Sequence, residues 1–234
     1  MLKLEDINLF YGEVQALWNI SLEVQEGETV ALLGANAAGK STTINAISGL
    51  EKITSGRILY QGEEIHGKDP HEIVELGIVQ VPEGRKLFSF MTIEENLELG
   101  AYSHRARKDF KKNLEMVYEL FPVLQERRKQ QAGSMSGGQQ QMCAIARGLM
   151  GSPKVLMIDE LSLGLAPIIV KKLFDVIKEI RQSGITVLLV EQNVNHSLAI
   201  SDKGYVLENG RVALSGNASD LLADPYLKRA YLGM

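Results

Sequence analysis

Residues 34–41 read Gly-Ala-Asn-Ala-Ala-Gly-Lys-Ser and match the phosphate-binding P-loop pattern G-x-x-x-x-G-K-[ST]. The apolar run Thr29–Leu33 precedes this segment, and the helix-like run Ser41–Leu50 follows it. In a loop between a strand and a helix, glycines let the backbone come close to an anion, and successive N–H groups point at phosphate oxygens. The segment therefore predicts a nucleotide phosphate site and not a plain glycine-rich turn.

Two side chains of this loop predict the chemistry of the site. Lys40 can reach the β- and γ-phosphates of ATP, and the Ser41 hydroxyl can bind Mg²⁺. We therefore predict Lys40 as a catalytic residue and Ser41 as a metal ligand. The residues expected to contact ATP in this segment are Gly34, Ala35, Asn36, Ala37, Ala38, Gly39, Lys40, Ser41 and Thr42.

The length, charge and cysteine content of the chain limit the classes of protein to which it can belong. The chain has 234 residues, 45% of them hydrophobic, and a net charge of −4. This length allows one or two domains with a sizeable core, and the acidic balance argues against nucleic acid as a partner. The single cysteine, Cys143, excludes an internal disulfide, and its helical context predicts a buried apolar position. The opening residues do not resemble a signal peptide, and no run of 18 apolar residues occurs, so a membrane role is expected to need a partner.

Strand-like and helix-like segments alternate along most of the chain, which predicts an α/β fold with a mostly parallel sheet. We expect strands at Leu2–Leu9, Ile20–Val24, Thr29–Leu33, Gly56–Tyr60, Gly77–Val81, Val155–Ile158 and Ile185–Val190, and a hairpin of Tyr205–Leu207 and Arg211–Leu214 around Asn209-Gly210. We expect helices at Ser41–Leu50, Pro70–Leu76 and Pro167–Gln182, and two short helices at the end. Residues 92–149 are helix-rich and open on a capping box at Thr92, so they are expected as an insertion.

Two further segments extend the predicted site. Asp159 and Glu160 follow the apolar run Val155–Ile158, where Asp159 can hold Mg²⁺ and Glu160 can orient or deprotonate an attacking water. The segment Ser136-Gly137-Gly138-Gln139 places two glycines at the start of a helix, which is a second anion cradle. Taken alone, that segment fits an ordinary N-capped helix better.

In this order, the Gly-Lys-Ser, Ser-Gly-Gly-Gln and Asp-Glu segments resemble the motifs of ATP-binding cassette (ABC) ATPases, over essentially the whole chain. The resemblance implies a P-loop NTPase fold with an antiparallel β subdomain near the N-terminus and an inserted helical subdomain. It implies one ABC ATPase domain over residues 1–234. Residues 1–83 and 150–234 form the nucleotide-binding core with the β subdomain, and residues 84–149 form the helical subdomain with the signature motif Ser136, Gly137, Gly138 and Gln139.

The resemblance also assigns roles to residues outside these motifs. Tyr11 matches the aromatic residue that stacks on adenine, although a strand-end core aromatic is the alternative. Glu83 stands where most ABC ATPases have the Q-loop glutamine, and it is expected to contact the nucleotide and the metal. Gln192 stands where most have the switch histidine and is expected to be catalytic. Residues Ser162–Leu165 stand at the D-loop, without its usual aspartate.

Glu83, Gln192 and the run 162–167 together look like the LivF-type ATPases of bacterial branched-chain amino acid importers. Met135 before the signature motif and the closing Ala230-Tyr231-Leu232-Gly233 also fit that branch. The related urea importer ATPases are similar but more often keep glutamine at the position of Glu83. Two residues depart from the branch: Ala37 replaces a usual glycine, so a positive φ is expected there, and Leu161 replaces a usual proline.

The resemblance implies an ATP-hydrolysing motor subunit of an importer, on the cytoplasmic face of the inner membrane. ATP would lie between the P-loop of one subunit and the signature motif of another. The expected partners are a second ABC ATPase, in a heterodimer or a homodimer, integral membrane permeases and, indirectly, a periplasmic binding protein. Two alternatives stay open: an ATPase of another ABC transporter, and a non-transport ABC ATPase that serves as an assembly scaffold. A P-loop enzyme that phosphorylates a small molecule is disfavoured by the Ser-Gly-Gly-Gln segment.

Overall fold

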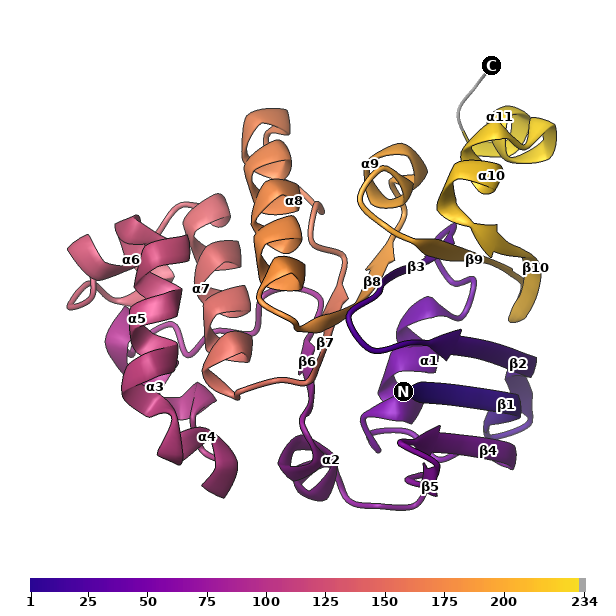
Figure 1. Ribbon diagram of the computed structural model, residues 1–234, viewed down its shortest axis with the longest axis horizontal. Helices are drawn as coiled ribbons and strands as arrows, with labels where there is room; N and C mark the ends of the chain where they lie inside the picture. Colours follow the sequence, from indigo (N-terminus) through magenta and orange to yellow (C-terminus); the bar gives the residue numbers. More distant parts are fainter. Residues whose placement is uncertain (232–234) are drawn as a thin grey trace.

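An antiparallel sheet forms the N-terminal part of the computed structural model, which describes residues 1–231. Its strand order is β2-β1-β4-β5 (Figure 1). The strands are β1 (Leu2–Tyr11), β2 (Val14–Val24), β4 (Ser55–Tyr60) and β5 (Glu63–Glu64). The predicted antiparallel subdomain is therefore present, with a β2 that starts earlier than expected and a short β5 that the sequence did not predict. Leu232 and Gly233, part of the closing segment quoted above, lie outside the described residues.

A second sheet of six strands has the order β10-β9-β3-β8-β7-β6. Its strands are β3 (Thr29–Gly34), β6 (Ile78–Val81), β7 (Val155–Asp159), β8 (Thr186–Glu191), β9 (Lys203–Glu208) and β10 (Arg211–Asn217). Pairing is parallel from β9 to β6, and only β10 runs antiparallel. Every residue of β3, β7 and β8 is buried, as expected for apolar runs covered on both faces of a parallel sheet. The predicted mostly parallel core is confirmed.

The helices outside the insertion follow the predicted alternation. They are α1 (Lys40–Ile47), α2 (Pro70–Leu76), α8 (Pro167–Gln182), α9 (Val194–Leu198), α10 (Ala218–Ala223) and α11 (Pro225–Tyr231). Both ends of α2 are where the sequence predicts them, because Asp69 and Glu72 form a capping box and Gly77 ends the helix at φ 101°. Helix α1 ends three residues earlier than expected. The short α9 was not predicted.

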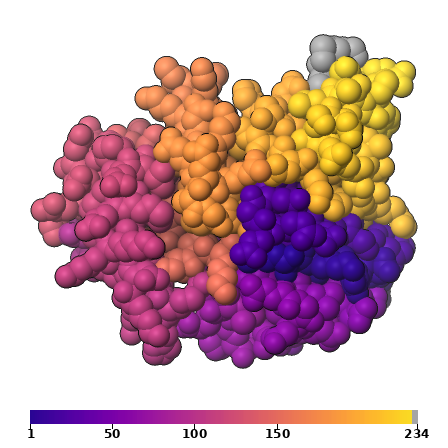
Figure 2. Space-filling model, viewed as in Figure 1, coloured from indigo at the N-terminus to yellow at the C-terminus, as the bar shows by residue number. Residues whose placement is uncertain are grey.

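The chain between β6 and β7 forms a block of helices at one end of the molecule (Figure 1, Figure 2). Its members are α3 (Ile93–Gly100), α4 (His104–Lys108), α5 (Phe110–Leu120), α6 (Pro122–Glu126), the 3₁₀ turn η1 (Ala132–Ser134) and α7 (Gly137–Met150). The predicted capping box of α3 is present, since the Thr92 hydroxyl accepts from the Glu95 N–H and the Glu95 carboxylate accepts from the Thr92 N–H. The division at residues 84 and 149 stays a prediction.

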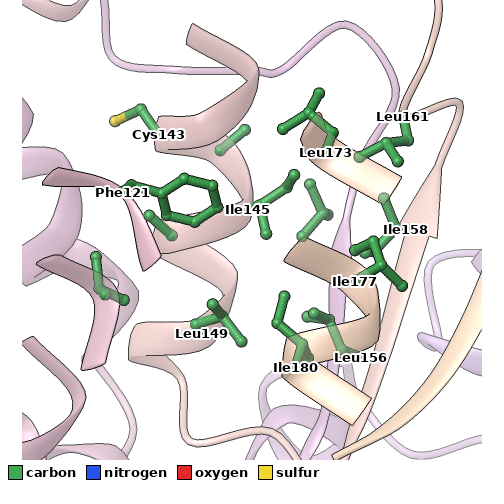
Figure 3. Packing of buried hydrophobic residues seen from close by; sticks show 14 of the residues in the cluster. Phe121, Cys143, Ile145, Leu149, Leu156, Ile158, Leu161, Leu173, Ile177 and Ile180 are labelled. Atoms are coloured by element: carbon green, nitrogen blue, oxygen red, sulfur yellow. The ribbon is translucent and has the colours of Figure 1, made fainter. Parts of the chain in front are cut away.

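One apolar core joins this block to the parallel sheet. Figure 3 shows side chains of α7 facing those of α8, which in turn pack on Ile158 of β7. Cys143 is fully buried in this core, as predicted, and burial raises the pKa of its thiol to about 12. Leu161 is also fully buried and faces Leu173 of α8 (Figure 3), so the residue that replaces a usual proline fills the core. No helix within residues 1–231 is long and apolar enough to cross a membrane.

Candidate active site

The strands β3, β8 and β7 are neighbours in the larger sheet and end together at one edge. Leu33 pairs with Glu191, and Val190 pairs with Asp159. In open parallel sheets, ligands bind outside the carboxyl ends of the strands. The P-loop leaves β3 at this edge and leads into α1, which begins at Lys40. The topology therefore brings the P-loop and the Asp159-Glu160 pair to the same place.

The shape of the P-loop depends on its glycines. A Cβ added at Gly34 would lie 2.4 Å from the Leu207 carbonyl oxygen, and one at Gly39 would lie 2.8 Å from Leu17 Cδ2. Neither position can hold a larger residue unless its neighbours move. Ala37 has φ 62°, which confirms the expected positive φ at the position where an alanine replaces a glycine. A side chain in this left-handed conformation costs about 1–2 kcal/mol.

Lys40 is held inside the loop that it follows. Its side chain is 4% exposed, and its ammonium group donates to the carbonyl oxygens of Gly34 at 3.0 Å and Ala35 at 3.1 Å. The same Nζ lies 3.6 Å from Oε1 of Glu160. The lysine therefore connects the P-loop to the end of β7, with its positive charge beside a carboxylate.

The two carboxylates after β7 lie in different surroundings. Asp159 is 3% exposed, and burial raises the pKa of its carboxyl to about 6, although a hydrogen bond from Ser41 opposes this shift. Its Oδ1 is buried without a hydrogen-bond partner among the described residues. Glu160 has φ 49° and donates its N–H to the Val190 carbonyl at 2.9 Å, which fixes an unusual backbone conformation. The Asp159 carboxylate is therefore buried beneath the site, and the Glu160 carboxylate lies closer to the protein surface.

A cavity of about 630 Å³ lies over these groups. Nine of the predicted site residues line it: Tyr11, Asn36, Ala37, Gly39, Lys40, Ser41, Thr42, Glu83 and Glu160. The remaining predicted residues of this region, Gly34, Ala35, Ala38 and Asp159, do not line it, although Ala38 and Asp159 are buried next to residues that do. Tyr11 is 45% exposed, which fits a side chain free to stack on a ligand better than the alternative of a core aromatic.

Sequence reasoning missed part of the cavity wall. Val14, Gln15 and Ala16 of β2, Leu163, and the turn Asn209-Gly210 also line the cavity. The turn supports the P-loop, because the Gly210 N–H donates to the Ala38 carbonyl at 3.0 Å. A Cβ at Gly210 would lie 2.2 Å from the Ala16 carbonyl oxygen. The Asn-Gly pair predicts the hairpin but carries no signal for the partner on which the turn packs.

Two predicted groups lie apart from the cavity in this single chain. Ser136 caps α7, where its hydroxyl accepts from the Gln139 N–H at 3.4 Å and the Gln139 side-chain oxygen accepts from the Ser136 N–H at 3.1 Å. A Cβ at Gly138 would lie 2.8 Å from Ile169 Cγ2, so this glycine allows α7 and α8 to pack closely. Gln192 is exposed directly after β8. Neither the signature segment nor Gln192 lines the cavity.

A protein-family model described as ABC transporter matches residues 17–162 of the chain. This chain belongs to the ABC transporter family. The high-affinity branched-chain amino acid transport ATP-binding protein BraG of Pseudomonas aeruginosa is 48% identical to it over 100% of both chains. The probable branched-chain amino acid transport ATP-binding protein LivF of Archaeoglobus fulgidus is 36% identical over 100% of this chain and 99% of its own.

A solved structure of an ATP-binding cassette of an ABC transporter, in its ADP conformation, superposes with a TM-score of 0.84. It is 30% identical to this chain and covers 100% of it, with 99% of its own length matched. The predicted fold class and the resemblance to ABC ATPases are therefore confirmed. The chain is an ABC-type ATPase, and the cavity over Lys40 is its candidate ATP site.

Proposed function

We propose that this ABC ATPase is the motor subunit of an importer of branched-chain amino acids. The observation that carries the proposal is that Lys40 and Glu160 line one cavity beside the P-loop, with the buried carboxyl of Asp159 next to them. The choice of substrate class rests on the similarity to BraG and LivF. Glu83, which lines the cavity where a glutamine is usual in the family, supports the same branch.

The residues beneath the cavity suit Mg²⁺. Asp159 Oδ1 is buried without a partner among the described residues, and Ser41 lies beside it with its hydroxyl able to turn toward a cation. Glu83 offers a second carboxylate at the cavity wall. Within residues 1–231, no group of three or more His, Cys, Asp or Glu side chains could hold a metal ion by itself. Mg²⁺ is usually bound by one or two protein carboxylates, and water and phosphate oxygens complete its coordination shell. When bound, Mg²⁺ neutralises charge on the phosphates.

The side chains around the cavity divide the work of hydrolysis. Glu160 takes the role of general base, because its carboxylate reaches the cavity and can accept a proton from water. Lys40 stabilises the negative charge that develops on the phosphates, and its hydrogen bonds to the P-loop carbonyls hold the ammonium group in place beforehand. Gln192 can hydrogen-bond a phosphate oxygen but cannot titrate as histidine would.

The catalytic unit is proposed to be a dimer. The chain has two phosphate-binding elements, the P-loop and the signature segment Ser136–Gln139, and the second does not line the cavity of its own subunit. A head-to-tail pair would place the signature segment of one subunit over the P-loop of the other. We therefore propose that a second ABC ATPase subunit completes each ATP site.

A groove of about 750 Å³ beside the helical block is the proposed docking place of an integral membrane permease. The chain that leaves the ATP cavity at Glu83 forms part of its wall, with Pro82 and Phe88 lining the groove. Phe88 is 53% exposed and Tyr102, which also lines the groove, is 74% exposed, so apolar surface is available to a partner. The subunit would then lie peripherally on the cytoplasmic face of the membrane.

Reconstitution tests the proposal. The chain alone should be monomeric or weakly associated, with slow ATP hydrolysis. Adding its second ATPase subunit, the permeases in lipid vesicles and the periplasmic binding protein should raise hydrolysis and allow ATP-dependent uptake of leucine. Full activity in an isolated monomer would contradict the composite site, and ATP-dependent uptake of urea without uptake of leucine would contradict the substrate class.

A further inference from the structure

Glu191 is a buried carboxylate to which sequence reasoning gave no role. It is the last residue of β8 and is 1% exposed. Its Oε1 accepts a hydrogen bond from the Ser162 backbone N–H at 2.8 Å, and its Oε2 accepts from the Ser162 hydroxyl at 2.8 Å. The backbone N–H of Gln192 also donates to Oε2, at 3.2 Å. One side chain therefore connects the segment after β7 to the segment after β8.

This arrangement is costly to the fold and does not serve ATP directly. Burying a carboxylate is unfavourable unless hydrogen bonds replace its water. Burial raises the pKa of Glu191, and the hydrogen bonds from Ser162 and the following backbone N–H groups oppose that shift. Glu191 does not line the ATP cavity. Its contacts thus point to a task carried out through its two neighbours.

The two neighbours of Glu191 lie next to the site, at the edge of the sheet where its parallel strands end. The residue after Ser162, Leu163, lines the ATP cavity together with Glu160. Gln192 is exposed at the edge of the sheet where β3 delivers the P-loop, and Glu191 pairs with Leu33 of β3. Glu191 therefore lies between the P-loop strand and the loop of residues Ser162–Leu165, called the Ser162 loop below.

We propose that Glu191 is a positioning residue that holds Gln192 and the Ser162 loop in one fixed arrangement, so that the two segments move as a unit during ATP hydrolysis. The inference rests on the proposed function, because it assigns Glu191 to the hydrolysis site. Glu191 acts only through its neighbours and touches no reacting atom. A movement of Gln192 is then passed to the Ser162 loop through the two hydrogen bonds that Ser162 donates to Glu191, while the Gln192 N–H holds the Glu191 carboxylate in place.

Glutamine is an informative replacement because it keeps the size of the side chain and removes one acceptor. With its oxygen toward the Ser162 N–H, the new amide nitrogen faces the Gln192 N–H, which is a second donor. With the amide turned over, the nitrogen faces the Ser162 N–H instead. In either orientation one backbone donor loses its acceptor, which costs a hydrogen bond in a buried site. The hydrogen-bond network that joins the two segments is therefore weakened in either orientation.

The test is a double-mutant cycle on the full chain, with steady-state MgATP hydrolysis for kcat and KM, calorimetry for the ATP dissociation constant, and the melting temperature. The variants are Glu191→Gln, Gln192→Ala and their combination. We expect Glu191→Gln to lower kcat about tenfold and to change the ATP dissociation constant less than about twofold. In the Gln192→Ala background, Glu191→Gln should cost less of kcat than it does in the parent, because part of its effect passes through Gln192. Glu179→Gln, the same change on the exposed face of α8, is the control and should match the parent.

Ser162→Ala provides a second, gentler variant in case Glu191→Gln does not fold. It removes one of the three hydrogen bonds and leaves the backbone donors satisfied. We therefore expect a few-fold loss in kcat, and this loss should not add fully to the loss caused by Gln192→Ala when the two changes are combined. The inference would be overturned if kcat were unchanged in both variants, or if their losses in kcat added fully to that of Gln192→Ala. It would also be overturned if ATP affinity and melting temperature fell in parallel with kcat. Failure of the proposed function is a separate result, because it would appear as transport of another solute or as full activity of the isolated parent monomer, and not as a change in these variants.

Discussion

The ammonium group of Lys40 lies 3.6 Å from the carboxylate of Glu160 while it donates to two carbonyl oxygens of the P-loop. The lysine comes from the start of α1 and the glutamate from the end of β7, 120 residues later in the chain. The pair places the group proposed to bind phosphate beside the group proposed to activate water. Removing either partner should therefore have a distinct and measurable effect.

Replacing Glu160 with glutamine should stop hydrolysis and keep ATP binding. The amide cannot accept a proton from water, and loss of a general base costs roughly 10²–10⁴-fold in rate. Lys40 and the P-loop are unchanged, so the ATP dissociation constant measured by calorimetry should stay close to that of the parent. Hydrolysis at the parent rate would exclude Glu160 as the base.

Replacing Lys40 with alanine should weaken MgATP binding strongly. The variant loses a buried, hydrogen-bonded charge that faces the phosphates, and such a contact contributes about 1.5–3 kcal/mol, or roughly 10–150-fold in the dissociation constant. Lys52→Ala, at an exposed position after α1, serves as the control and should bind ATP normally. Equal affinities of the two variants by calorimetry would contradict the assignment of the phosphate site.

Replacing Ala37 with glycine should stabilise the protein slightly. At φ 62° glycine relieves about 1–2 kcal/mol of strain, but it also makes the unfolded chain more flexible, which costs about 0.4–1 kcal/mol. The net gain should be at most about 1.5 kcal/mol, seen as a rise of a few degrees in melting temperature. Ala35→Gly is the matched control, because Ala35 is an exposed neighbour that has no positive φ, and it should bring no gain.

Replacing Asp159 with asparagine should stabilise the ligand-free protein at neutral pH and abolish its use as a metal ligand. Burial raises the pKa of Asp159 from 3.8 to about 6, so the folded state of the parent loses stability as pH rises from about 4 through 6. The asparagine variant does not lose stability in this way, because its side chain does not ionise. In buffer with EDTA, its advantage in urea unfolding should be near zero at pH 4 and should reach at most about 3 kcal/mol above pH 7. An advantage that shrinks as pH rises would contradict the raised pKa.

The sequence was sufficient to predict the fold class and most of the residues that the structure gathers at the cavity over the P-loop. The P-loop pattern fixes residue types and spacing that only one local geometry satisfies, and the alternation of apolar runs with helical segments dictates a parallel sheet. The extent of α2 and the cap of α3 were also predictable, because capping residues act within one turn of the helix. The positive φ of Ala37 was expected from the resemblance, because glycine is usual at this position in similar ATPases.

Only the tertiary structure decided which distant segments meet. The support of the P-loop by Gly210, the approach of Lys40 to Glu160, and the burial of Glu191 against Ser162 all arise from the order of strands in the sheet. Strand order is set by packing between residues far apart in the chain, so local sequence patterns do not predict it. The separation of Ser136–Gln139 from the cavity of its own subunit agrees with the resemblance, which implies that this segment acts on the ATP site of another subunit.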